Sequence, residues 1–336
     1  MSLTFGLVLD FAAPNVTLEE QLKRYRPIIE AADRHGFHSV TMGEGYSTAP
    51  QWGHTPAPFL VLAALAPMTR MKIGSGVTLL PAWNPLKLAY DTTVLDQLSG
   101  GRLIVGVGLG APDLGPRYGH PQARKSGYTD EMLAALKALW SGADGYEGRY
   151  ITIDGGIGLP PIQPGGPPIW VGGSVQRSAD RAAEYGDGYI GSTSQSFDAV
   201  VQQGERYRAA LQARGKDSRT AIVASNRLTL VAETEAEARA LAEPYCGEVL
   251  SFYANRGAQM PEEYVRKGKS PAELFNAFDE TRCLVGTPDN VIERARRYEQ
   301  AGVTHIMARI TPHGIPPEHA VRTVELLGKH VLPEFR

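Results

Sequence analysis

Short apolar runs alternate with patterns typical of amphipathic helices along most of this chain, and this alternation constrains the fold more than any other feature. Turn residues bound the apolar runs, which are too short for helices and are therefore predicted strands. The eight predicted strands lie at Phe5–Leu9, Ser39–Met42, Lys72–Leu80, Leu103–Val107, Ile169–Val171, Gly188–Ile190, Ala221–Val231 and Thr304–Ile310. Strands joined by helical crossovers run parallel, so the sequence predicts an α/β fold of the (β/α)8 TIM-barrel type.

Two stretches interrupt the alternation. Residues 141–168 are rich in Gly and Pro, and Arg149–Asp154 alternates like part of an extra strand pair, which indicates an excursion on the rim of the barrel. Residues 243–279 mix Gly, Pro and aromatic residues and are long for a structureless loop, so we expect a lid-like insertion there. No linker with a shift in composition is present, and residues 1–336 are expected to form a single domain.

Charge and composition exclude several classes of partner. The net charge of −2 gives no basic surface for nucleic acid or for an anionic membrane. The two cysteines, Cys246 and Cys283, lack the spacing of a zinc site, so no metal is expected, and they suggest reduced thiols. No signal-peptide pattern and no long apolar run occurs, which leads us to expect a cytoplasmic protein.

The functional end of a parallel barrel is the carboxyl end of its strands. Asp10 and Glu44 follow the first two predicted strands and could hold a ligand over the barrel, or could equally accept hydrogen bonds from nearby loop amides. Arg309 lies near the end of the last predicted strand. Four nearby side chains are candidates for an apolar pocket wall: Tyr46, Trp52, His54 and Trp83.

Glycines recur where two of these strands end. Gly106, Gly108 and Gly110 alternate after Leu103–Val105, and strand-end glycines leave room for a flat ligand against the backbone, although tight strand packing explains them as well. The pair Gly74 and Gly76 suggests a bulge or, alternatively, an ordinary buried strand of small residues.

A second glycine turn points to an anion. Gly172, Gly173 and Ser174 follow a predicted strand and open the helix predicted at Val175–Tyr185. The N–H groups at the start of a helix, together with the Ser174 hydroxyl and Arg177, would form an anion site. The alternative is a plain turn in which Ser174 caps the helix.

These motifs also carry a family resemblance. Residues 95–110 read Leu-Asp-Gln-Leu-Ser-Gly-Gly-Arg-Leu-Ile-Val-Gly-Val-Gly-Leu-Gly and, with Leu79–Pro85, resemble the signature of the luciferase-like monooxygenase family. Gly172–Ile190 is similar to the segment that binds the cofactor phosphate in that family. The resemblance covers roughly residues 3–310, apart from the insertion near 243–279, and implies a flavin-dependent oxidoreductase. The expected reaction uses reduced FMN and dioxygen on a small organic substrate; the alternative is hydride transfer with the deazaflavin coenzyme F420.

The resemblance also implies roles for individual residues and partners. Asp10 and Glu44 would be catalytic, and a non-proline cis peptide bond is expected at Gly76–Val77. A separate flavin reductase and a homodimer are further implications. The implied cofactor contacts are Gly76, Val77, Thr78, Gly108, Leu109, Gly172, Gly173, Ser174, Arg177, Gly191 and Ser192.

The sequence departs from the family pattern at informative places. Residues Met42–Tyr46 keep an acid but lack the histidines that follow the second strand in many relatives. Leu109 stands where some flavin-dependent members have arginine, and Ala111 where deazaflavin members often have glutamate. Two further functions therefore stay open: a non-catalytic flavin-binding barrel, and a phosphosugar enzyme that uses the same anion site.

Overall fold

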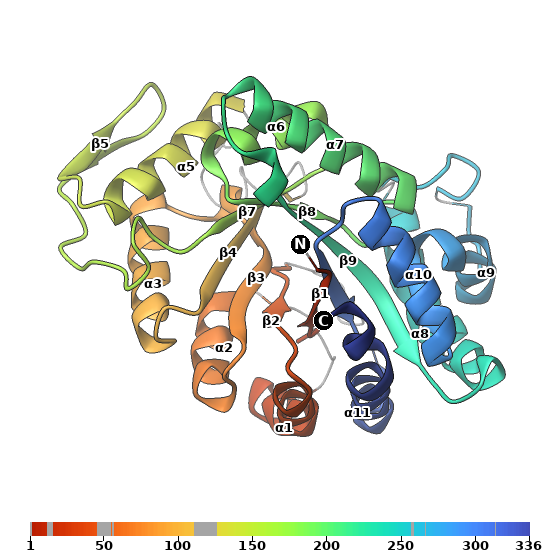
Figure 1. Cartoon of the computed structure of the whole chain (residues 1–336). Helices are drawn as coiled ribbons and strands as arrows, with labels where there is room; N and C mark the ends of the chain where they lie inside the picture. Colours follow the sequence, from red (N-terminus) through yellow and green to blue (C-terminus); the bar gives the residue numbers. More distant parts are fainter. Residues whose placement is uncertain are drawn as a thin grey trace.

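In the described part of the chain, eight parallel strands close into a barrel inside a ring of helices (Figure 1). The computed structural model describes residues 2–11, 16–45, 55, 57–110, 126–256, 259–265, 267–312 and 314–336. The barrel strands are β1 (Thr4–Val8), β2 (Ser39–Met42), β3 (Lys72–Leu79), β4 (Leu103–Gly108), β7 (Ile169–Gly172), β8 (Gly188–Gly191), β9 (Ile222–Val231) and β11 (His305–Arg309). Pairing of β8 with β9, β9 with β11 and β11 with β1 closes the circle, so the predicted (β/α)8 fold is confirmed.

Helices cover the outside of the barrel, and local sequence explains where several begin and end. The Thr17 side chain accepts from the N–H of Glu20 at the start of α1, and Gly36 ends that helix with φ of 73°. The helices are α1 (Leu18–His35), α2 (Pro58–Leu65), α3 (Pro85–Leu98), α5 (Ser126–Trp140), α6 (Gln176–Tyr185), α7 (Phe197–Ala213), α8 (Glu235–Asn255), α9 (Pro271–Arg282), α10 (Pro288–Gln300) and α11 (Pro317–Leu326). None of these helices is both long and apolar enough to cross a membrane.

The structure corrects the interpretation of residues 243–279 as an irregular insertion. Residues 243–255 are the second half of α8, which continues through Pro244, and residues 271–279 belong to α9. Gly247 lies where the two helices meet, because a Cβ atom there would be 2.3 Å from the carbonyl oxygen of Pro271. Gly247 therefore serves the packing between the two helices, and neither it nor Pro244 marks a loop.

A strand that the sequence did not predict supports α8 and α9. Strand β10 (Cys283–Gly286) pairs with the last residues of β9, from Leu228 to Val231, beyond the part of β9 that pairs with β8. The apolar side chains of β10, outer β9, α8 and α9 form an apolar cluster, the second cluster, distinct from the main core. Its members include Leu228, Leu230, Cys246, Leu250, Phe275 and Val285.

The excursion at residues 141–168 is present as predicted and lies outside the barrel (Figure 1). It contains an antiparallel hairpin of β5 (Gly145–Glu147) and β6 (Thr152–Asp154). The Glu131 carboxylate of α5 accepts from the N–H groups of residues 149, 150 and 151 in the hairpin turn. The buried Asp96 carboxylate accepts from Ile162 and Gln163 at the other end, so two carboxylates fix the excursion to the helix layer.

Apolar side chains fill the inside of the barrel below its carboxyl end. They come from most of the barrel strands and comprise Val8, Ile104, Trp170, Ile190, Ala224 and Met307. The buried His305 accepts or donates at both ring nitrogens, to the hydroxyls of Thr4 at 2.7 Å and Ser39 at 3.1 Å. Burial, with His38 nearby, lowers the pKa of His305 to about 3, so its imidazole is neutral. The barrel is therefore packed at its amino end, and open space is left at the carboxyl end.

Candidate active-site cavity

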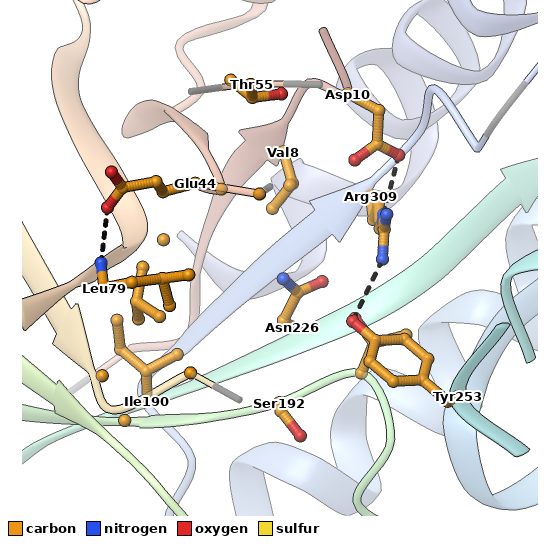
Figure 2. A pocket seen from close by; sticks show the side chains of 18 of the residues that line it. Val8, Asp10, Glu44, Thr55, Leu79, Ile190, Ser192, Asn226, Tyr253 and Arg309 are labelled. Carbon is orange, nitrogen blue, oxygen red and sulfur yellow. Dashed lines mark hydrogen bonds and ion pairs between the residues drawn. The ribbon is translucent and has the colours of Figure 1, made fainter. Parts of the chain in front are cut away.

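A cavity of about 480 Å³ lies at the carboxyl ends of the barrel strands (Figure 2). Its volume falls in the range of about 300–1,000 Å³ that is usual for small-molecule sites. Among the residues that the sequence singled out, the following line it: Asp10, Glu44, Gly76, Val77, Gly108, Leu109, Gly172, Gly173, Ser192 and Arg309. Residues far apart in the sequence thus meet at one site, at the end of the barrel where the fold places function.

The floor of the cavity is a bulge in β3. The expected non-proline cis bond at Gly76–Val77 is present, and the pairing of β3 with β4 shifts between Ser75 and Thr78. The Val77 side chain then lies close to two glycines: a Cβ atom would be 2.8 Å from it at Gly108 and 3.3 Å at Gly172. These glycines let Val77 lie close to the neighbouring backbone, which leaves little side-chain volume above the floor.

Gly106 has a different reason to be glycine. A Cβ atom at this position would lie 2.1 Å from the carbonyl oxygen of Ser75 on the neighbouring strand. The alternative of tight strand packing therefore holds for Gly106, which does not line the cavity. Of the alternating glycines, Gly108 and Gly110 are the ones that line it.

Glu44 fastens the end of the bulged strand. Its carboxylate accepts from the N–H of Leu79 at 2.5 Å (Figure 2). It also accepts from Nε1 of Trp83 at 3.0 and 3.1 Å. Its own N–H donates to the carbonyl oxygen of Val77 at 3.0 Å. The side chain is 8% exposed, and these contacts match the alternative in which the carboxylate serves loop amides.

Asp10, Arg309 and Tyr253 form a polar chain on the other side of the cavity (Figure 2). Nε of Arg309 donates to Oδ2 of Asp10 at 2.7 Å, and Nη1 lies 3.5 Å from the hydroxyl of Tyr253 on α8. Burial disfavours the charge of Arg309, but the Asp10 carboxylate beside it leaves the pKa of Arg309 raised from its ordinary value. A charged guanidinium is thus held at the cavity by an anionic partner that follows β1 and a phenol on α8.

The residues predicted for the anion site do not all lie at the cavity. Gly172 and Gly173 line the cavity, whereas Ser174 and Arg177 do not. The Arg177 guanidinium pairs with Asp130. Val175, and not Ser174, occupies the cap position of α6, and no side chain caps this helix. The carbonyl of Ser174 instead accepts from Nε2 of Gln203 at 2.8 Å.

Other predicted contacts also lie away from the cavity wall. Thr78 is fully buried and does not line the cavity. Gly191 is a packing position, since a Cβ atom there would be 2.7 Å from Val200 of α7. Trp83 is engaged with Glu44. Three of the aromatic candidates lie outside the described residues: Tyr46, Trp52 and His54.

Sequence reasoning missed several lining residues. Asn226 lines the cavity, and its Oδ1 is buried without a hydrogen-bond partner among the described residues; the same holds for Oγ1 of Thr193, which follows the predicted contacts Gly191 and Ser192 at the end of β8. Asn226 was detectable by strand alternation, because it shares the inward face of β9 with Ile222 and Ala224. The others lie at or after the end of α8, in the segment interpreted as irregular: Phe252, Tyr253, Arg256 and Gln259.

Comparison with known proteins identifies relatives along nearly the whole chain. The oxygenase component of the flavin-dependent trigonelline monooxygenase of Acinetobacter baylyi is 27% identical, over 94% of this chain and 91% of that protein. The FMNH2-dependent dimethylsulfone monooxygenase of Pseudomonas putida is 26% identical, over 93% of this chain and 87% of that protein.

Solved structures agree. The monooxygenase RslO1 from Streptomyces bottropensis superimposes with a TM-score of 0.82 at 27% identity, covering 99% of this chain and 100% of that chain. The oxygenating constituent of 3,6-diketocamphane monooxygenase from Pseudomonas putida, solved with FMN, gives 0.78 at 26% identity, over 100% and 99%. The coenzyme F420-dependent tetrahydromethanopterin reductase of Methanopyrus kandleri shares the fold, with a TM-score of 0.79 at 19% identity over both full chains.

The family model for luciferase-like monooxygenases matches residues 3–305. The match therefore includes the bulged floor, the Gly172–Gly173 turn and the loop after β8 that together form the cavity. With relatives of the same kind along nearly the whole length, this chain belongs to the luciferase-like monooxygenase family.

Proposed function

We propose that this protein is an FMN-dependent monooxygenase that uses reduced FMN and dioxygen to oxygenate a small organic substrate, with a separate reductase supplying the reduced flavin. The observation that carries the proposal is the cavity itself, with its glycine-flanked Val77 floor at the carboxyl end of the barrel. Relatives named as flavin- or FMNH2-dependent monooxygenases support the choice of FMN over F420.

The residues present fit such a cofactor. The floor offers a valine side chain between Gly108 and Gly172, which suits the face of a flat ring. Above it, the Thr193 hydroxyl and the Asn226 amide oxygen are buried without partners, and buried polar atoms are normally hydrogen-bonded. A ligand with polar groups would supply those partners. When bound, reduced FMN supplies the electrons that activate dioxygen, while the protein supplies position and exclusion of water.

In this proposal the two carboxylates predicted as catalytic act through other groups. Glu44 holds Leu79 and Trp83 and thereby fixes the shape of the floor. Asp10 orients Arg309, and the Arg309 guanidinium and the Tyr253 hydroxyl are placed to donate hydrogen bonds to an oxygen atom of the substrate. The cavity then has a cofactor half around Val77 and a substrate half beside α8.

The test mixes the purified full chain with oxidised FMN, with reduced FMN and with F420, and follows absorbance and fluorescence. We expect binding of FMN and, with a reductase and NADH or NADPH, oxygen consumption that a substrate couples to formation of an oxygenated product. Binding of F420 with anaerobic reduction of a substrate would replace this proposal by the hydride-transfer alternative. Flavin binding without turnover of any aldehyde, alkane, sulfur or nitrogen compound would indicate a non-catalytic binder.

We also propose that the protein forms a homodimer through α2 and α3. Leu60 of α2 is 75% exposed and Leu98 of α3 is 64% exposed, and Val94 and Tyr90 lie one and two turns before Leu98 on the same face. Exposed apolar side chains that gather on adjacent helices are typical of interaction surfaces. A second copy of the chain would bury this face.

A further inference from the structure

The loop of residues 192–195, which follows β8, has its carbonyl groups bound to two buried arginines. Nη1 of Arg227 donates to the carbonyl oxygens of Gln195 at 2.9 Å and Ser192 at 3.3 Å. Nε of Arg282, at the end of α9, donates to the carbonyl oxygen of Ser194 at 3.0 Å. Ser192 itself lines the cavity, so one layer of backbone separates the cavity from both guanidinium groups.

The guanidinium groups of both arginines lie in the helix layer outside the barrel. Arg227 follows Asn226 on β9, and because Asn226 faces the cavity, the next side chain points to the opposite face. There the Arg227 guanidinium lies 5.4 Å from the ring centroid of Tyr298 on α10, and that of Arg282 lies 4.2 Å from the ring centroid of Phe278. The carbonyl groups that these arginines bind therefore point away from the cavity.

The two positive charges lack a carboxylate partner in the part of the chain that the structure describes. Among the described residues, no ion pair involves either side chain, and Nε and Nη2 of the fully buried Arg227 have no hydrogen-bond partner. By contrast, Arg239 and Arg294 in the same layer pair with Asp279. Burial and the neighbouring Arg227 lower the pKa of Arg282 to about 10. Buried charges are normally paired, so this pair leaves positive charge behind the loop without a matching anion.

On the cavity side of the same loop, the Thr193 hydroxyl lacks a hydrogen-bond partner among the described residues. The Thr193 side chain is 1% exposed, lines the cavity and has an unsatisfied Oγ1. The hydroxyl of Tyr189 donates to the carbonyl oxygen of Gly173 and lies 3.1 to 3.3 Å from the Gln195 amide, which ties the loop to the Gly172–Gly173 turn. A polar hydroxyl in front and two cations behind are complementary to an anionic group of a ligand.

We infer that Arg227 and Arg282 are positioning residues for a phosphate group: they hold the loop of residues 192–195 with Thr193 toward the cavity and compensate the ligand's negative charge from behind the backbone. The inference rests on the proposed function, in which the phosphate is that of FMN. In this inference Arg227 and Arg282, and not the predicted Arg177, supply the positive charge near the phosphate. Their guanidinium groups act through the loop and do not touch the reacting atoms.

The experiment compares binding of FMN and riboflavin, which share a ring system and differ in the phosphate. Dissociation constants are measured by flavin fluorescence on the full apoprotein. For wild type we expect tighter binding of FMN. Arg282→Met should weaken FMN binding about tenfold, the order expected for loss of one positive charge that acts through a layer of backbone, and change riboflavin binding less than about twofold.

Two further variants separate charge from packing. Arg282→Lys keeps the charge and should retain most of the preference for FMN. Arg239→Met, which removes an arginine of the same layer that has a carboxylate partner and no contact with the loop, should leave the preference unchanged. If folded Arg282→Met protein weakens FMN and riboflavin equally, or if Arg282→Lys loses the preference as fully as Met does, the arginines are structural clamps and the inference is overturned.

Inorganic phosphate provides a readout that needs no flavin. Phosphate should raise the thermal midpoint of the wild-type apoprotein more than chloride at equal ionic strength, and this excess should disappear in Arg282→Met. Absence of an excess in wild type overturns the inference. A wild-type protein that binds neither flavin refutes the proposed cofactor, while the phosphate measurement still decides the role of the arginines.

Discussion

Replacing Glu44 by alanine tests whether the floor of the cavity depends on one carboxylate. The change removes the acceptor of the Leu79 N–H and of Nε1 of Trp83. A hydrogen bond to a charged group contributes about 1.5–3 kcal/mol, and the half-buried Trp83 can recover part of its loss from water. We therefore expect the free energy of unfolding to fall by about 2–4 kcal/mol. Urea denaturation followed by tryptophan fluorescence measures this fall.

The same variant should also lose cofactor affinity. Without Glu44, the end of β3 is free to move, and Val77 no longer has a fixed place between Gly108 and Gly172. We expect the dissociation constant for FMN to rise at least about tenfold, which corresponds to about 1.4 kcal/mol. Flavin fluorescence titration measures it.

Glu131 offers a matched control for this prediction. Its carboxylate also accepts from backbone N–H groups, at residues 149–151, but in the rim hairpin away from the cavity. Glu131→Ala should lower stability while leaving the FMN dissociation constant within about twofold of wild type. If Glu44→Ala behaves like Glu131→Ala, with a stability loss and unchanged FMN affinity, the role of Glu44 in shaping the floor is refuted.

Four further changes have distinct expected results. Asp10→Asn removes the anionic partner of Arg309 and should lower turnover more than FMN affinity; equal losses in steady-state and binding measurements would contradict the division of the cavity into two halves. Arg177→Met should leave FMN affinity within about twofold by titration, because Asp130 already engages that guanidinium, and a tenfold loss would restore the sequence-based assignment. Burial lowers the pKa of His305 to about 3 in the folded chain, so below the unfolded value of about 6.5 the unfolded chain binds one more proton and the free energy of unfolding falls as pH falls. In His305→Gln, denaturation curves should show a smaller fall with pH, by up to about 1.4 kcal/mol per pH unit. A pH dependence equal to that of wild type would refute this role of His305. Leu98→Glu should convert a dimer to a monomer in light scattering, and an unaltered mass would exclude this face as the interface.

The barrel could be predicted from the sequence because each of its strands is marked by residues that are neighbours in the chain. Each barrel strand is a short apolar run between turn signals, and parallel strands with helical crossovers leave few arrangements. The register shift of β3 after Ser75, which the glycine pair Gly74 and Gly76 suggested, and the place of Asp10 and Glu44 at the carboxyl end also follow from local residues.

What the sequence did not predict depends on tertiary contacts. Pro244 and Gly247 disfavour a helix, yet α8 continues because it packs on α9 and β10. Arg177 follows a glycine turn as a phosphate ligand would, but Asp130, from a helix far away in the sequence, pairs with it. The outward direction of the Arg227 side chain can be inferred only once Asn226, its neighbour on β9, is known to point into the cavity.

The second cluster under α8 and α9 has a consequence for how this protein can diverge. Tyr253 and its neighbours rest on that cluster, whereas Val77 and its flanking glycines rest on the barrel's own packing. Substitutions in the second cluster would therefore change the cavity wall at Tyr253 and leave the barrel packing under Val77 unchanged. Under the proposed division of the cavity, these substitutions would alter the substrate side and leave the packing beneath the cofactor side unchanged.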